Sequence, residues 1–254
     1  MSSLNVATFQ YDIAWESPDK NLDYIHSRID FDTDLLILPE MFTTGFSMDP
    51  ERLAVAMDNH QVDIVQQIAN EFDMYIMGSM IISDRGHYFN RLILFSPDLS
   101  PRYYDKRHLF TYGTEDQHYA SGNQDGIFEI GDWKICARVC YDLRFPVWSR
   151  NVSDYDLLVY VANWPLARQK AWDTLLLARA IENQSYVIGV NRVGTDGNGL
   201  KYGGGSAIIN YRGDILTHAR DEERIDTQVL IMDSLRDFRS KYPFLKDRDH
   251  FTIH

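Results

Sequence analysis

Residues 34–40 read DLLILPE, an almost unbroken apolar run that ends in a proline and a glutamate. A strand with one wet face alternates apolar and polar residues, whereas a run without alternation is typical of a strand covered on both faces. We therefore expect a central sheet with further layers packed on each side of it. Glu40 then either stands at the end of a buried strand, where a carboxylate is costly unless it has partners, or already lies in solvent because Pro39 ends the strand.

Periodicity elsewhere predicts the same layered organisation. Short β-rich runs occur at 4–10, 35–39, 74–82, 88–96, 127–139, 157–161, 186–191, 205–210 and 227–232. Amphipathic helical patterns occur at 18–30, 58–72, 168–183 and 233–239. Because some strands alternate with helices and others follow one another directly, we expect a mixed α/β protein with helices outside and sheet inside. The length predicts one domain, residues 1–254.

Composition excludes several classes of partner. The chain has 25 basic and 37 acidic residues, a net charge of -12, so its average field repels phosphate backbones and anionic lipids. We expect no nucleic acid and no membrane partner, since no stretch approaches the ~20 apolar residues of a membrane span. The first residues lack the basic region and long apolar run of a secretory signal, so we expect a cytoplasmic protein.

The two cysteines, Cys136 and Cys140, lie in one short segment. In a strand, residues four apart are separated by roughly 13 Å, which is beyond the reach of a disulfide. No partner segment with zinc-site spacing occurs elsewhere, so we predict no metal. Each thiol is therefore either buried and inert or reactive.

Cys140 stands at a junction in KICARVCYDLRFPVWSR, where a β-like run passes into a predicted helix. A nucleophile at such a point projects above the sheet, and the backbone N–H groups that follow it can stabilise a thiolate and an oxyanion. The arrangement is that of a nucleophile elbow without its usual glycines. Cysteine is also commonly a small buried hydrophobe, so both interpretations stay open for Cys140, while Cys136 is assigned to the core.

Two further charged residues are candidates on weaker grounds. Lys106 follows an expected strand within RYYDKRHLF, and Glu115 lies in YGTEDQHY. A single lysine in a charged run is usually a solvated surface residue, and a glutamate between glycine and histidine is often in a loop. Neither residue stands out by itself.

A cysteine nucleophile ordinarily needs a base. Among the eight histidines none pairs obviously with Cys140, although His108 and His118 stay open. A carboxylate can serve as the base when burial raises its pKa, and a nearby lysine can stabilise the thiolate and the oxyanion. A glutamate, a lysine and a cysteine are therefore chemically sufficient.

Several segments in this order resemble the nitrilase superfamily of carbon-nitrogen hydrolases. They are LPEMF at 38–42, YDKRHLF at 104–110, CYDLRFPVWSRN at 140–151, LVYVANWP at 158–165, LLLARAIENQSYVIGVNRVG at 175–194 and GSAIINYRGDIL at 205–216. The wording of TTGFSM and DYDLLVYVANWP looks most like the bacterial branch of omega-amidases. These enzymes hydrolyse the side-chain amide of 2-oxoglutaramate and 2-oxosuccinamate.

The resemblance implies an α/β fold of one kind, the four-layer αββα sandwich, in which two sheets pack face to face between helices. It also implies a homodimer, a small amide as the substrate, a cysteine thioester intermediate and no cofactor. Periodicity alone predicts layered α/β and not this sandwich.

The resemblance also assigns roles to individual residues. It implies that Glu40 is the general base and acid, that Lys106 stabilises the oxyanion and that Cys140 is the nucleophile. Glu115 matches a second glutamate that orients the lysine, and the backbone N–H of Tyr141 completes the oxyanion site.

The residues that bind the rest of the substrate are less determined. Trp164 could line the pocket, but a large apolar residue is more often in the core. An omega-amidase needs a cation or several hydrogen-bond donors for the substrate carboxylate. Arg107 and Arg168 are candidates, although surface placement is the more common situation for each. Arg144 and Arg179 recur across relatives with different substrates, so we expect structural roles for them.

Other functions remain open at this point. The same three catalytic residues would serve a nitrilase, an N-carbamoyl amidohydrolase or an amidase for aliphatic amides. An inactive relative that acts as a scaffold is a more remote alternative, since such a protein has no chemical need for all four charged and thiol residues.

Overall fold

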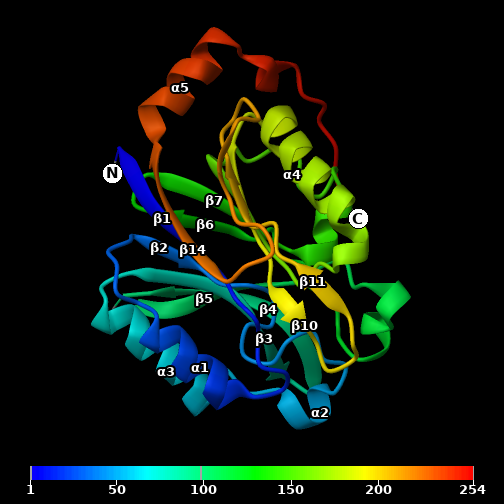
Figure 1. The fold of residues 1–254 in the computed structure, drawn as a ribbon. Helices are drawn as coiled ribbons and strands as arrows, with labels where there is room; N and C mark the ends of the chain where they lie inside the picture. Colours follow the sequence, from blue (N-terminus) through cyan, green and yellow to red (C-terminus); the bar gives the residue numbers. More distant parts are fainter. Residues whose placement is uncertain (1, 98, 254) are drawn as a thin grey trace.

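In a computed structural model that describes residues 2–97 and 99–253, the chain forms two six-stranded sheets and a small two-stranded one (Figure 1). The first large sheet has the strand order β14–β1–β2–β3–β4–β5. These strands are β14 (Arg224–Ile231), β1 (Ser3–Gln10), β2 (Leu35–Ile37), β3 (Tyr75–Asp84), β4 (His87–Ser96) and β5 (Leu99–Asp105). The strands β1, β2 and β3 are parallel, and the other pairings are antiparallel.

The second large sheet repeats this plan with the order β13–β12–β9–β8–β7–β6. Its strands are β13 (Ile215–His218), β12 (Ala207–Ile209), β9 (Tyr186–Val190), β8 (Leu157–Val161), β7 (Trp133–Val139) and β6 (Ile127–Ile130). Here β7, β8 and β9 are parallel. Each sheet therefore has parallel strands at its centre and antiparallel strands at its edges.

The two sheets pack face to face because both faces of their strands are apolar. In β1, Leu4 and Val6 join the cluster between the sheets, whereas Ala7 and Phe9 join the cluster beneath the helices on the other face. Helices α1 (Pro18–Ser27) and α3 (His60–Glu71) cover the first sheet, and α4 (Gln169–Asn183) covers the second (Figure 1). A further helix is α5 (Met232–Lys241). The predicted αββα sandwich is confirmed.

Some predicted boundaries were wrong. The run 127–139 is a hairpin of β6 and β7, because Gly131 adopts a left-handed backbone with φ +56° and reverses the chain. The helix expected after Cys140 is only the five-residue 3₁₀ turn η3 (Cys140–Arg144). Periodicity also missed α2 (Pro50–Leu53) and the small hairpin of β10 (Val193–Thr195) and β11 (Lys201–Gly203), which are too short to show a period.

Candidate active site

Segments from both large sheets meet at one place. Glu40 follows the parallel strand β2 of the first sheet, and Cys140 follows the parallel strand β7 of the second. In α/β sheets, ligands bind at the carboxyl ends of parallel strands, where loops carry the polar groups. Lys106 directly follows β5, the edge strand of the first sheet.

Lys106, Glu40 and Glu115 form a buried ionic cluster. The Lys106 Nζ donates to Glu40 Oε1 at 2.8 Å and to the two carboxylate oxygens of Glu115 at 3.0 and 2.9 Å. All three side chains are 0% exposed. Burying one cation and two carboxylates is costly even with good geometry, and sites that bear this cost are frequently functional.

The charges of the cluster depend on one another. Burial alone lowers the pKa of Lys106, but the carboxylates of Glu115 and Glu40 reverse this effect and raise it well above its usual value. For Glu115, burial has the opposite effect and raises the pKa of the carboxyl group, and the Lys106 cation offsets this rise only in part. Lys106 therefore stays protonated, so it acts as a fixed positive charge and not as a base.

Two asparagines that sequence reasoning missed hold the carboxylates in place. Asn90 Nδ2, from β4, donates to Glu40 Oε1 at 2.8 Å and to Glu115 Oε1 at 3.0 Å. The Asn163 backbone N–H donates to Glu40 Oε2 at 2.8 Å, and its side-chain amide donates to the Glu40 carbonyl. For Asn90 the available signal was a polar residue inside a strand, which predicts a buried hydrogen bond but not its partner, whereas Asn163 lies in the loop after β8 (Leu157–Val161).

Cys140 has the strained backbone of a nucleophile elbow. Its φ is +44°, a left-handed value that is uncommon for a residue other than glycine. The side chain is almost fully buried, and Sγ lies 4.0 Å from the Asn163 carbonyl as a donor. Burial raises the pKa of the Cys140 thiol, Glu40 raises it further through its charge and a hydrogen bond, and Lys106 opposes both. The resting thiol is therefore protonated and has a carboxylate beside it to receive the proton.

The turn after Cys140 is fastened by Asp142, which is fully buried. Its Oδ2 accepts from the Val139 N–H at 3.0 Å and from the Tyr104 hydroxyl at 2.8 Å. Its Oδ1 accepts from the backbone N–H and from Nδ1 of His108, at 3.0 and 2.8 Å. A carboxylate with this many donors is stabilised in its ionised form.

We expect Asp142→Asn to make stability less dependent on pH. Burial raises the pKa of Asp142, but the hydrogen bonds from His108 and Val139 outweigh it and hold the pKa below its usual range. The ionised carboxylate therefore contributes stability above the unfolded pKa of about 3.9, and this contribution is lost as pH falls through the folded value. Urea unfolding at several pH values should show the variant less stable at pH 7, with a difference that narrows in acid. A difference that stays constant with pH would contradict this.

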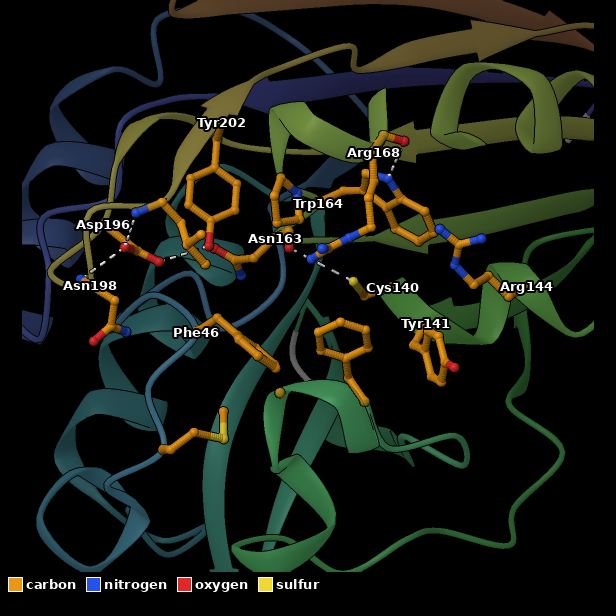
Figure 2. A pocket seen from close by; sticks show the side chains of 15 residues that line it. Phe46, Cys140, Tyr141, Arg144, Asn163, Trp164, Arg168, Asp196, Asn198 and Tyr202 are labelled. Carbon is orange, nitrogen blue, oxygen red and sulfur yellow. Dashed lines mark hydrogen bonds between the residues drawn. The ribbon is translucent and has the colours of Figure 1, made fainter. Parts of the chain in front are cut away.

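Beside Cys140 lies a cavity of about 140 Å³ (Figure 2). This is smaller than the roughly 300–1,000 Å³ of pockets for drug-sized ligands, so it suits a small molecule. Its wall consists of Phe46, Met48, Phe110, Gly113, Cys140, Tyr141, Arg144, Asn163, Trp164, Pro165, Arg168, Asp196, Asn198, Leu200 and Tyr202. The wall is therefore largely apolar and carries two arginines.

Most of the residues predicted to bind substrate lie in the cavity wall. Tyr141 and Trp164 both line the cavity, and the indole Nε1 of Trp164 donates to the Arg168 carbonyl at 2.9 Å. Arg168 and the exposed Arg144 lie in the same wall, a position that the expectation of a structural role for Arg144 did not include. Arg107 lies elsewhere, with its guanidinium 4.4 Å from the Trp148 ring centroid.

The remaining predicted residues have no place in the cavity wall. Arg179 is buried and donates to the Leu143 carbonyl at 2.6 Å, in keeping with a structural role. Cys136 is buried and free, and His118 is exposed. Among residues 2–97 and 99–253, no group of three His, Cys, Asp or Glu side chains is arranged to hold a metal ion. In the same part of the chain, no helix has both the length and the apolar character for crossing a membrane.

Comparison with known proteins agrees with this geometry. Residues 5–237 match the carbon-nitrogen hydrolase family. The chain is 43% identical to the omega-amidase YafV of Escherichia coli over 100% of both chains, and 35% identical to the 2-oxoglutaramate amidase of Paenarthrobacter nicotinovorans over 85% of this chain and 78% of that protein. A crystal structure from Xanthomonas campestris, of a superfamily member with an arsenic adduct in its active site, superimposes with a TM-score of 0.97 at 40% identity over 100% of both chains. The chain therefore belongs to the carbon-nitrogen hydrolase family, the predicted nitrilase superfamily, and to its omega-amidase branch.

Proposed function

We propose that this protein hydrolyses the terminal amide of small dicarboxylic acid monoamides such as 2-oxoglutaramate and 2-oxosuccinamate, and releases ammonia. The observation that carries the proposal is that the Cys140 thiol lies beside Glu40 and Lys106 of the buried ionic cluster. Cys140 also lines a small cavity whose wall contains two arginines. The substrate class is also that of similar proteins, an omega-amidase and a 2-oxoglutaramate amidase.

In the first step, the Cys140 sulfur attacks the amide carbonyl while Glu40 takes the thiol proton. The carbonyl oxygen becomes an oxyanion, which the Lys106 ammonium and the backbone N–H of Tyr141 stabilise. Glu40 then returns the proton to the nitrogen, the C–N bond breaks, and ammonia leaves. The product of this half-reaction is a thioester on Cys140.

In the second step, Glu40 removes a proton from water as the water attacks the thioester. Lys106 and Tyr141 stabilise the second oxyanion, which collapses to the free acid, and the thiol recovers its proton from Glu40. Glu115 and Asn90 take no proton in either step. They hold the Lys106 ammonium and the Glu40 carboxylate through the contacts of the buried cluster.

The arginines of the cavity suit the other end of the substrate. The Arg168 guanidinium lies 5.1 Å from the Phe110 ring centroid, and that of Arg144 lies 4.9 Å from Trp164 (Figure 2). Within residues 2–97 and 99–253, neither guanidinium is paired with an acidic side chain. Asp196, the acidic residue of the wall, already accepts from the Tyr202 hydroxyl at 2.9 Å. We propose that Arg168, and Arg144 at the outer side, bind the substrate carboxylate.

The experiment is to measure ammonia release from 2-oxoglutaramate and from butyramide, an amide without a carboxylate. We expect a much higher kcat/KM for 2-oxoglutaramate. Arg168→Gln should raise the KM for this substrate about 10- to 100-fold, which corresponds to the free energy of one hydrogen bond to a charged group. Hydrolysis of butyramide should stay unchanged. Assays with glutamine, an N-carbamoyl amino acid and a simple nitrile distinguish the proposed activity from those of other hydrolases with this fold.

The matched control is Lys170→Gln, which removes the same charge two residues away at an exposed position outside the cavity wall. This variant should behave like the wild type. If Arg168→Gln lowers kcat/KM equally for 2-oxoglutaramate and butyramide, Arg168 does not bind the substrate carboxylate. If the wild type prefers another compound of the series, the protein is a different hydrolase of this fold.

We also propose that residues 1–254 act as a single domain, in a homodimer, in the cytoplasm. A reducing compartment suits an enzyme whose two thiols are both free. Exposed apolar side chains such as Val147, Val152 and Ile181 offer surface for a second copy. Light scattering measures the assembly in solution.

A further inference from the structure

Two residues outside the reaction scheme connect the catalytic segments of the two sheets. His108 lies two residues after Lys106, and Asp142 lies two residues after Cys140. Their side chains meet, with His108 Nδ1 2.8 Å from Asp142 Oδ1. Because the carboxylate is ionised and can only accept, Nδ1 is the donor of this hydrogen bond.

The hydrogen bonds to Asp142 come from both sheets. The His108 backbone and ring and the Tyr104 hydroxyl belong to the segment that carries Lys106, at the end of β5. The Val139 N–H, which donates to the same oxygen as Tyr104, belongs to β7, and Val139 immediately precedes the nucleophile. One buried carboxylate thus connects the lysine segment of the first sheet to the cysteine turn of the second.

Aromatic packing fixes the His108 ring in the same orientation. The ring stacks on Phe145 with centroids 3.8 Å apart and planes 6° apart, and it contacts Trp148 edge-on. Trp148 Nε1 donates to the Tyr104 hydroxyl at 2.9 Å. Since Phe145 and Trp148 follow the cysteine turn in sequence, the turn and the lysine segment interlock through side chains as well as hydrogen bonds.

The strain at Cys140 explains why such a connection is needed. A left-handed backbone in a non-glycine residue persists only where its surroundings over-determine it. The ammonium of Lys106 is held by two carboxylates of its own side of the site, Glu40 and Glu115. Its position relative to the sulfur therefore depends on how the first sheet is tied to the turn.

We propose that His108 and Asp142 are positioning residues that set the placement of Lys106 relative to the Cys140 sulfur. This inference rests on the proposed function for the roles of Lys106 and Cys140. The sequence left His108 open as the base of the cysteine; in the structure its Nδ1 bonds Asp142, and the group hydrogen-bonded to the Cys140 thiol is the Glu40 carboxylate.

The test separates the two contacts of the His108 ring. His108→Phe keeps the stacking but removes the Nδ1 donor, whereas His108→Asn removes the ring but keeps a donor at the same distance from the backbone. We expect His108→Phe to lower kcat for 2-oxoglutaramate by up to about 10²-fold with KM unchanged, since small misplacements have effects of this size. His108→Asn should recover most of the loss, which a purely structural role of the ring would not allow.

A second readout does not depend on the substrate. The rate at which iodoacetamide labels the Cys140 peptide at a fixed pH should fall in His108→Phe, because the Lys106 cation that favours the thiolate is displaced. If the wild type hydrolyses no monoamide but the labelling rates still differ in this way, the positioning role stands and the proposed function fails.

The matched controls are His118→Phe and His118→Asn at an exposed histidine, which should keep wild-type rates. Tyr104→Phe removes a different donor to Asp142 and should lower kcat in the same direction, so it replaces His108→Phe if that variant does not fold. Wild-type kcat and labelling in His108→Phe would overturn the proposal, as would an equal loss in His108→Asn or a parallel rise of KM.

Discussion

Replacing Cys140 with alanine is expected to abolish ammonia release from 2-oxoglutaramate, with kcat reduced about 10⁴-fold or more. Loss of the nucleophile removes the covalent route altogether, and what remains is binding and oxyanion stabilisation. The change deletes one sulfur atom from a buried side chain, so the fold should persist. Ammonia assays give the rate, and mass spectrometry of acid-quenched protein should show an acyl adduct on the wild type only.

Cys136→Ala is the matched control for this experiment. Cys136 lies in β7 four residues before the nucleophile, and burial raises the pKa of its thiol to about 11, so it stays protonated and inert. The variant should lose some stability and keep its turnover. Comparable turnover in wild type and Cys140→Ala would contradict the covalent mechanism. If both alanine variants are as stable as the wild type but inactive, the experiment would not identify Cys140 as the nucleophile.

Lys106→Met is expected to reduce both activity and stability. The substitution preserves an unbranched chain of similar length but removes the cation between the Glu40 and Glu115 carboxylates. Breaking a buried ion pair on one side typically costs about 3–5 kcal/mol of unfolding free energy. Loss of one oxyanion donor typically costs about 10²- to 10³-fold in kcat. Urea unfolding and ammonia release measure the two effects on the same preparations.

A double variant separates the two roles of the lysine. Lys106→Met with Glu115→Gln removes one buried negative charge together with the positive one, so most of the lost stability should return. Activity should not return, because the oxyanion still lacks its cation. If the single variant is as stable as the wild type, or if the double variant regains turnover, the lysine does not have the role assigned to it.

The fold could be predicted from sequence as far as local patterns extend. The almost unbroken apolar run at 34–40 indicates a strand covered on both faces, and β2 is buried between the second sheet and the helices. The turn at Gly131 did have a local signal, because a Gly-Asp pair separates β6 from β7 by only two residues, and the prediction of one strand over 127–139 did not use it. That the layers form an αββα sandwich came from the family resemblance and not from periodicity.

The residues of the site also divide into those that local motifs predict and those whose contacts form only in the folded chain. Glu40, Lys106, Glu115 and Cys140 were predicted from motifs, and the structure brings them together. Asn90 was not, because its contacts arise only where strands and loops distant in sequence come together. A buried asparagine in β4 indicates a hydrogen bond, but its two carboxylate partners lie 50 and 25 residues away.

The pairing of β1 with β14 has a consequence for how the chain is made. Ser3 pairs with Ile231, so β1 leaves the ribosome long before β14, the strand that covers its outer edge. An uncovered edge strand presents unpaired backbone groups to other chains and is a template for aggregation. Nascent chains stopped before Arg224 should therefore depend on chaperones, although every residue of the catalytic cluster has already been synthesised.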